Sequence, residues 1–368
     1  AMLRRIVEEI ARWLPWTPTM RVVLLGVEYD ASEDSQREAF LADFCSRLQL
    51  TYRRGLSVPI RLASGKEIAS DAGWGCMLRA TQMMLAQCLV ALVLGRAWRY
   101  DVARDLADGS PFLEIASCFL DSPSAPLSLH AMVAAGQRLL GKEPSAWFGP
   151  TSAAQAACHC VQAVAAAAAG GAAASGDGAA APAFLRRVRC AVFEDGAIFK
   201  ETVLELFEGG CEAVILLVCR RLGLDAFNVA EYRPGIESCF ALPEFQGLAS
   251  GNSASSAHYF PGTHDDCLLY LDPHKTLPAL ESVADVCRSP GRSDRGFEAS
   301  RPLPLRWSRL NASVCLGFLV KSREEFLSLC DKLSEGARGD VLEVLERRPA
   351  YEGCAEVDAE DGDMVLLG

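Results

Sequence analysis

The stretch Ser70-Asp71-Ala72-Gly73-Trp74-Gly75-Cys76-Met77-Leu78-Arg79-Ala80 places a cysteine directly after a tryptophan that two glycines flank. Gly73 and Gly75 permit a tight backbone path, and they let a ligand approach more closely than residues with a Cβ would. From Cys76 onward no Gly or Pro occurs before Gly95, and apolar residues recur at helical spacing. The sequence therefore predicts a buried helix of about five turns that begins at Cys76.

The position at a helix start makes Cys76 a candidate nucleophile. The unpaired N–H groups and the positive end of the helix dipole lie at this end, and they favour ionisation of a thiol to the reactive thiolate. The alternative is an inert, buried thiol, because the chain has 15 cysteines and cysteine is commonly buried. Composition favours the inert thiol, whereas the Gly-Trp-Gly lead-in favours the nucleophile.

The overall composition indicates a globular protein. Half of the 368 residues are hydrophobic, so one large domain or two can bury a sizeable core. The net charge of −11, without a Lys/Arg block, argues against a nucleic-acid partner. The odd number of scattered cysteines and the absence of a secretory leader favour a reducing compartment, so we expect a cytoplasmic protein.

Composition also divides the chain into three parts. Residues 1–20 form an amphipathic segment, interpreted as a helix packed on the body, with a membrane-surface element as the alternative. Residues 21–345 form the main domain, which contains a low-complexity stretch of Ala and Gly at about 163–182, either a fraying helix or a flexible insertion. Residues 346–368 form an acidic tail that we expect to be disordered.

Local patterns predict further elements around the candidate nucleophile. Residues 22–29 have the composition of an early strand. Residues 247–256 are rich in Gly, Ser, Asn and Ala, which predicts a mobile loop. The strongest apolar runs, 83–94 and 213–219, are too short to cross a membrane.

A cysteine nucleophile needs a nearby base and a group that orients it. Asp272 and His274 are two residues apart, so in an extended chain their side chains leave the same face. Pro273 favours extended backbone at Asp272. The alternative for this segment is a turn with a solvated histidine. His258, in a strand-like stretch after the predicted loop, is a rival base that local chemistry does not exclude.

Two aromatic residues and one cysteine-rich trio have two interpretations each. Tyr52 is either a core aromatic or a site residue. Trp147 lies between turn-forming residues, where packing is the commoner role and ligand contact the alternative. The trio Cys158-His159-Cys160 suggests a metal, but no second ligand pair occurs at zinc-finger spacing. We therefore expect no metal and no other cofactor.

Several stretches together resemble the autophagin family of papain-like cysteine peptidases. Two of them are similar to the family's active-site signatures: Gly73-Trp74-Gly75-Cys76-Met77-Leu78-Arg79 with Gln82-Met83, and Leu271-Asp272-Pro273-His274. Supporting matches occur in family order, namely Thr51-Tyr52-Arg53, Trp147-Phe148-Gly149-Pro150, Arg221-Leu222-Gly223-Leu224, Ser256-Ala257-His258-Tyr259-Phe260 and Gly317-Phe318. The resemblance implies an α+β papain-like fold, in which a helix carrying the nucleophile packs on an antiparallel sheet.

The resemblance also implies roles for individual residues. It makes Cys76 the nucleophile, His274 the base and Asp272 the group that orients it. It assigns the oxyanion hole to the Tyr52 hydroxyl and the Cys76 backbone N–H.

The same resemblance implies a covered substrate site. Trp74, Trp147 and Gly251 are expected there, and Trp147 with the loop at 247–255 is expected to cover the thiol until substrate opens it.

The implied activity is that of a cysteine endopeptidase. It cleaves after a glycine near the C-terminus of the ubiquitin-like autophagy modifier, matures the modifier's precursor and releases the modifier from phosphatidylethanolamine. We expect a monomer that contacts membrane surfaces transiently through the lipid conjugate. Two alternatives stay open: a peptidase for a different ubiquitin-like modifier, and a catalytically silent protein that binds the modifier.

Overall fold

The structure is a computed structural model, and it describes residues 21–169, 181–224, 226–253, 256–288, 297 and 301–349. The predicted amphipathic segment 1–20, the middle of the Ala/Gly stretch at 170–180 and residues 350–368 of the predicted tail lie outside the described residues. Residues 163–169, at the start of that stretch, belong to a helix that runs from Pro150 to Ala169.

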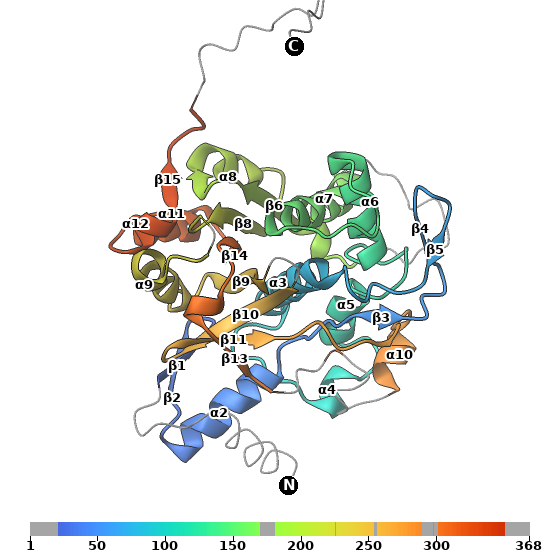
Figure 1. The fold of residues 1–368 in the computed structure, drawn as a ribbon, viewed down its shortest axis with the longest axis horizontal. Helices are drawn as coiled ribbons and strands as arrows, with labels where there is room; N and C mark the ends of the chain where they lie inside the picture. The colour runs from blue at the N-terminus through green and yellow to red at the C-terminus, as the bar shows by residue number, and fades with distance from the viewer. Residues whose placement is uncertain are drawn as a thin grey trace, which may run out of the picture.

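A nine-stranded sheet forms the centre of the molecule (Figure 1). Its strands are β1 (Arg21–Leu24), β2 (Val27–Asp30), β6 (Val188–Phe193), β8 (Ala213–Arg221), β9 (Phe245–Ser253), β10 (Ser256–His264), β11 (Cys267–Leu271), β13 (Leu303–Arg306) and β14 (Ser313–Val320). The order is β13-β11-β10-β9-β14-β8-β6, and β1 joins β10 and β2. Among the described strands of this sheet, β6 and β8 alone pair in parallel, so the sheet is largely antiparallel.

Helices surround this sheet and several short strands lie outside it. The helices are α2 (Asp34–Cys45), α3 (Cys76–Val93), α4 (Val102–Asp105), α5 (Pro111–Ser117), α6 (Leu129–Leu140), α7 (Pro150–Ala169), α8 (Lys200–Leu206), α9 (Val229–Phe240), α10 (Val283–Cys287), α11 (Arg323–Leu333) and α12 (Arg338–Val341). The short strands are β3 (Arg53–Arg54), β4 (Ile60–Arg61), β5 (Glu67–Ile68), β7 (Ala197–Phe199), β12 (Leu277–Pro278) and β15 (Glu343–Leu345). Mixed helices and a largely antiparallel sheet confirm the predicted α+β class.

Strand β8 shows why the sheet is buried on both faces. Alternate residues from Ala213 to Cys219 enter the core that contains α3 and α7. The residues between them, from Val214 to Val218, enter a second core that contains α9 and α11. A continuous apolar run is typical of a strand that is covered on both sides.

Helix α3 is the central helix, and it begins at Cys76 as predicted. It packs against β9, β10 and α7. Its apolar run at 83–94 is too short to cross a membrane, but the whole helix is longer. Among the described helices α3 alone is long and apolar enough to do so. Because 89% of it is buried inside the protein, it is a core helix.

The strand predicted at 22–29 is a hairpin of two strands. Leu25 and Gly26 connect β1 to β2 with φ values of 48° and 81°. Positive φ at two successive residues is the geometry of a tight hairpin turn. The strand-forming residues on both sides hid this turn, since only one of the two turn residues is a glycine.

The mobile loop predicted at 247–256 is wrong for most of its length. Strand β9 continues to Ser253, and β10 begins at Ser256. The small residues serve close packing instead: a Cβ at Gly247 would lie 2.6 Å from the Tyr259 ring. Since β9 also packs against α3, small side chains here let a strand and a helix approach each other.

Candidate active site

Cys76 is delivered to the start of α3 by a tight turn that begins at Asp71. The Asp71 carbonyl accepts hydrogen bonds from the backbone N–H groups of Trp74 (3.2 Å) and Gly75 (2.9 Å). Gly73 has a φ of 88°, and a Cβ at Gly75 would lie 2.7 Å from the Asp71 carboxylate. Both glycines are therefore required by the turn. The Cys76 side chain is fully buried, at 0% exposure.

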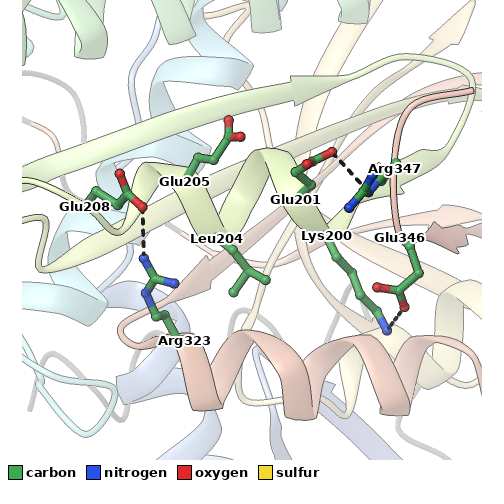
Figure 2. Close-up of a pocket in the computed structure, with 8 residues that line it drawn as sticks. All are labelled: Lys200, Glu201, Leu204, Glu205, Glu208, Arg323, Glu346 and Arg347. Carbon is green, nitrogen blue, oxygen red and sulfur yellow. Dashed lines mark hydrogen bonds and ion pairs between the residues drawn. The ribbon is translucent and has the colours of Figure 1, made fainter. Parts of the chain in front are cut away.

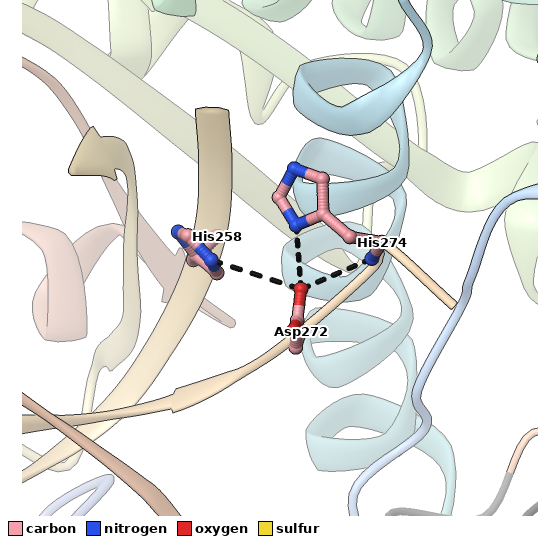
Figure 3. Close-up of side chains that lie close together, drawn as sticks. All are labelled: His258, Asp272 and His274. Carbon is pink, nitrogen blue, oxygen red and sulfur yellow. Dashed lines mark hydrogen bonds and ion pairs between the residues drawn. The ribbon is translucent and has the colours of Figure 1, made fainter. Parts of the chain in front are cut away.

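His274 and Asp272 follow β11 and lie beside the helix start (Figure 3). The Asp272 Oδ1 atom is 2.5 Å from His274 Nδ1, and it also accepts the His274 backbone N–H at 3.0 Å. Since Nδ1 is engaged, Nε2 is left for the Cys76 thiol, with which the imidazole is hydrogen-bonded. The Ser256 hydroxyl is a further neighbour, 3.4 Å from Nε2. The structure thus brings together the three residues predicted as nucleophile, base and orienter.

The thiol and the imidazole shift each other's pKa toward an ion pair. Burial raises the pKa of the Cys76 thiol, but hydrogen bonds from the side chains of His274, Tyr52 and Trp147 outweigh burial, so the pKa lies below its ordinary value. Burial lowers the pKa of His274, but its hydrogen bonds with Asp272 and Cys76 raise it to about 9. A thiolate beside an imidazolium is the reactive form of a cysteine nucleophile.

Tyr52 lies against both members of this pair. Its ring meets the His274 ring edge-on, with 5.4 Å between centroids. Its backbone N–H donates to the Pro273 carbonyl at 2.7 Å, and its carbonyl accepts from Leu277 at 2.9 Å. Burial raises the pKa of Tyr52, and the hydrogen bond with Cys76 raises it further. The hydroxyl therefore keeps its proton and can donate a hydrogen bond to an oxyanion.

Trp147 approaches the thiol from the loop between α6 and α7. Its indole N–H is buried and meets no nitrogen or oxygen acceptor among the described residues. The group that it faces is the Cys76 sulfur, whose pKa it helps to lower. Trp147 thus contributes to the closed surroundings of the thiol.

Two other predicted site residues lie farther out. The Trp74 indole N–H donates to the Ser70 carbonyl at 3.2 Å, so this ring braces the turn before Cys76. Gly251 lies in β9, opposite Ala257 of β10. The Ala257 backbone N–H is one of the groups that lower the pKa of Cys76. Substrate binding by Trp74 and Gly251 stays a prediction.

The rival base His258 also lies at this site, but it differs from His274 in its charge. Its Nε2 is 3.7 Å from Asp272 Oδ1, and the side chain is 5% exposed. Burial lowers its pKa to about 4, so it is neutral at physiological pH. Ligand atoms of His258, Asp272 and His274 lie within 4.8 Å of one another, as in metal sites. A metal here would have to displace the 2.5 Å hydrogen bond between Asp272 and His274.

The sequence predictions missed several polar groups around the site. Ser256 belongs to one of the stretches that resemble the family, but no role is predicted for its hydroxyl, which lies beside His274. Asp71 and Arg79 flank Cys76, and both are fully buried and form an ion pair of 2.7 Å. A signal was available, because Arg79 is the only charged residue in the mostly apolar sequence of α3.

A charged depression of about 270 Å³ lies between α8, α11 and the chain after β15 (Figure 2). It is lined by Lys200, Glu201, Leu204, Glu205, Glu208, Arg323, Glu346 and Arg347. Ion pairs join Lys200 to Glu346 at 2.7 Å, Arg323 to Glu208 at 3.7 Å and Arg347 to Glu201 at 3.8 Å. Its lining contains no Cys, Ser or His, so it offers no thiol or hydroxyl nucleophile and no imidazole base.

Comparison with known proteins agrees with this geometry. Residues 37–332 match the peptidase C54 catalytic domain. The chain is 30% identical to the cysteine protease ATG4B of Gallus gallus over 93% of this chain and 89% of the relative. It is 31% identical to a probable cysteine protease atg4 of Aspergillus oryzae, covering 81% and 72% of the two chains. A probable cysteine protease ATG4 of Pichia angusta is 29% identical over 95% and 72%. The chain therefore belongs to the peptidase C54 family, the autophagins, and is an autophagy-related cysteine peptidase.

Proposed function

We propose that this peptidase cleaves after a glycine near the C-terminus of the ubiquitin-like autophagy modifier, and that it also releases the modifier from phosphatidylethanolamine. The observation that carries the proposal is the buried Cys76 thiol hydrogen-bonded to the His274–Asp272 pair, in a chain whose signature stretches resemble the autophagins. We propose a monomeric, cytoplasmic enzyme without a cofactor, which meets membranes only through its lipid-linked substrate.

In the proposed mechanism, the Cys76 thiolate attacks the glycine carbonyl carbon. The resulting oxyanion accepts hydrogen bonds from the Tyr52 hydroxyl and the Cys76 backbone N–H. The His274 imidazolium donates its proton to the leaving amine, and the C–N bond breaks to leave a thioester on Cys76. The neutral His274 then takes a proton from water, and the hydroxide attacks the thioester to release the modifier and the thiolate.

The closed surroundings of the thiol support the choice of glycine. Cys76 is 0% exposed, with Trp147 and the Ala257 backbone close to its sulfur. A residue with a side chain would need more space at the scissile carbonyl than glycine, which has no Cβ. The leaving group is an amine in both the precursor and phosphatidylethanolamine, so one mechanism serves both substrates.

The test is incubation with two substrates, a modifier precursor with residues beyond its glycine and the modifier linked to phosphatidylethanolamine in vesicles. We expect the wild type to cleave both and Cys76→Ala to lose about 10⁶-fold in rate, as in other hydrolases that lose their nucleophile. The matched control is Cys88→Ala, since Cys88 is equally buried on the same helix and burial raises its pKa. Its loss should leave cleavage nearly unchanged.

The other outcomes identify the alternatives. Binding of the precursor without cleavage would show a silent binding protein. An intact autophagy modifier alongside a trimmed second modifier would show a peptidase with a different substrate. For the oxyanion hole, Tyr52→Phe should lower kcat by about 10²-fold, the usual effect of losing one donor. Unchanged turnover in Tyr52→Phe would remove Tyr52 from the mechanism.

A further inference from the structure

Four buried charged side chains form a network next to the segments that carry Tyr52 and Cys76. They are Arg53, Asp71, Arg79 and Asp121, and none is more than 1% exposed. Two are cationic and two are anionic, so the charges of the network balance. We refer to them as the buried quartet.

Arg79 is the centre of the buried quartet. Its Nε donates to Asp71 Oδ2 at 2.7 Å, and its Nη2 donates to Asp121 Oδ1 at 2.8 Å. The remaining branch, Nη1, donates to Gln82 at 3.2 Å. One planar guanidinium therefore fixes two carboxylates relative to α3, which a flexible lysine could not do with the same geometry.

Each carboxylate uses its other oxygen to hold a backbone N–H. Asp71 Oδ1 accepts from the backbone N–H of Arg53 at 2.5 Å. Asp121 Oδ2 accepts from the backbone N–H of Leu280 at 2.9 Å. The Asp121 N–H also donates to the Leu280 carbonyl at 2.7 Å, so this segment is held twice.

These backbone contacts reach the segments that carry the oxyanion-hole groups. Arg53 directly follows Tyr52, and β3 pairs with β12, which lies just before Leu280. Asp71 starts the turn that ends at Cys76. The buried quartet thus connects the backbone next to the Tyr52 hydroxyl with the backbone that presents the Cys76 N–H.

Stability alone is a weak reason for four buried charges. Removing them from water is expensive, and apolar side chains of similar volume often serve a core equally well. A rigid ionic network can instead select one geometry. We propose that Arg79, Asp71 and Asp121 are positioning residues for the oxyanion hole, holding the Tyr52 hydroxyl and the Cys76 N–H at a fixed separation; this rests on the proposed function.

The proposal separates two properties of the site. Thiolate formation depends first on the hydrogen bond of Cys76 with His274, and less on those with Tyr52 and Trp147. The described contacts of the buried quartet go to neither the Cys76 nor the His274 side chain. Acylation depends also on the oxyanion hole. Damage to the buried quartet should therefore lower the rate of acylation more than it lowers the amount of thiolate.

The experiment compares two rates in Arg79→Gln. One is kcat/KM for cleavage of the modifier precursor, and the other is alkylation of Cys76 by iodoacetamide, which needs the thiolate but no oxyanion hole. We expect the ratio of the cleavage rate to the alkylation rate to fall by about 10- to 100-fold, mainly because kcat falls. This loss is smaller than or equal to the loss caused by removing one oxyanion-hole donor completely. A ratio that falls less than about fivefold overturns the proposal.

The matched control is Arg47→Gln. Arg47 is also fully buried, lies 3.2 Å from the buried Asp43 and donates to Gln87 at 2.7 Å, outside the buried quartet. Arg47→Gln should lose stability as Arg79→Gln does, but its ratio of cleavage to alkylation should equal that of the wild type. An equal fall of the ratio in both variants would show a general effect of instability and would overturn the proposal.

A second variant and a second substrate cover the cases in which the first experiment gives no result. If Arg79→Gln does not fold, Arg79→Lys replaces it, because it keeps the charge and loses the fork; the same fivefold threshold applies. If the wild type cleaves no modifier precursor, the proposed function fails. The ratio is then measured with the p-nitrophenyl ester of N-benzyloxycarbonyl-glycine as acyl donor, so the role of the buried quartet is decided separately.

Discussion

His274 and His258 lie side by side, 5.0 Å apart between ring centroids, and face the same carboxylate, yet their pKa values move in opposite directions (Figure 3). The pKa of His274 rises to about 9, whereas that of His258 falls to about 4. His274 has a 2.5 Å contact with Asp272 and a thiol partner, while His258 stands 3.7 Å from Asp272.

The difference shows that a nearby carboxylate does not by itself charge a histidine. For His258 burial is the largest effect, and the more distant Asp272 does not overcome it. For His274 burial also lowers the pKa, but the hydrogen bonds and charges of Asp272 and Cys76 together overcome it. Only His274 then carries a proton at neutral pH that it can give to a leaving amine.

The largest expected effect is the loss of the charged histidine. His274→Ala should lower kcat/KM by about 10⁶-fold, the usual result of losing the base of such a triad. His258→Asn should lower it by less than about tenfold, or about 1.4 kcal/mol of barrier. Precursor cleavage by the two purified variants checks this contrast. Equal losses would contradict the assignment of His274 as the base.

The next effect concerns the carboxylate that both histidines face. Asp272→Asn should lower kcat by about 10⁴-fold, because an amide does not hold the His274 ring in the required tautomer or stabilise its charged form. Single-turnover cleavage of the precursor measures this loss. If Asp272→Asn and His258→Asn were equally active, the 2.5 Å contact of Asp272 with His274 would have no catalytic role.

The pH profile should separate the same groups. Thiolate increases as pH rises past the lowered pKa of Cys76, and imidazolium disappears as pH rises through about 9, the pKa of His274. Activity should therefore be bell-shaped, with its alkaline limb near pH 9. In Asp272→Asn that limb should move down by about two units toward the ordinary histidine value. Measurement of kcat/KM across the pH range checks this, and an unmoved limb contradicts it.

The smallest effect is on stability and belongs to His258. The pKa is about 4 when folded and 6.5 ordinarily, so between these values the unfolded chain binds more protons. The contribution of a neutral His258 is complete above about pH 6.5 and decreases as pH falls, by about 2 kcal/mol at pH 5. Urea unfolding at pH 7 and pH 5 measures this decrease. In His258→Asn the decrease should be smaller by that amount, and an equal decrease would contradict a neutral His258.

Two features of the site could not be predicted from local sequence composition. The Gly- and Ser-rich stretch before His258 has loop composition, but most of it is strand β9, because small residues let it pack against α3. Composition reports side-chain size and does not report which partner uses the space. The buried quartet was missed because its members come from positions 53, 71, 79 and 121, which only the fold brings together.

By itself the sequence determined the local parts of the site. A helix starts at Cys76, since no Gly or Pro interrupts it, and Asp272 and His274 share a face, since side chains alternate in extended chain. Only the tertiary structure decided which histidine is charged and how Tyr52 and the buried quartet surround the thiol. The physical reason is that a pKa and a hydrogen bond depend on burial and distance, and groups far apart in the sequence set both.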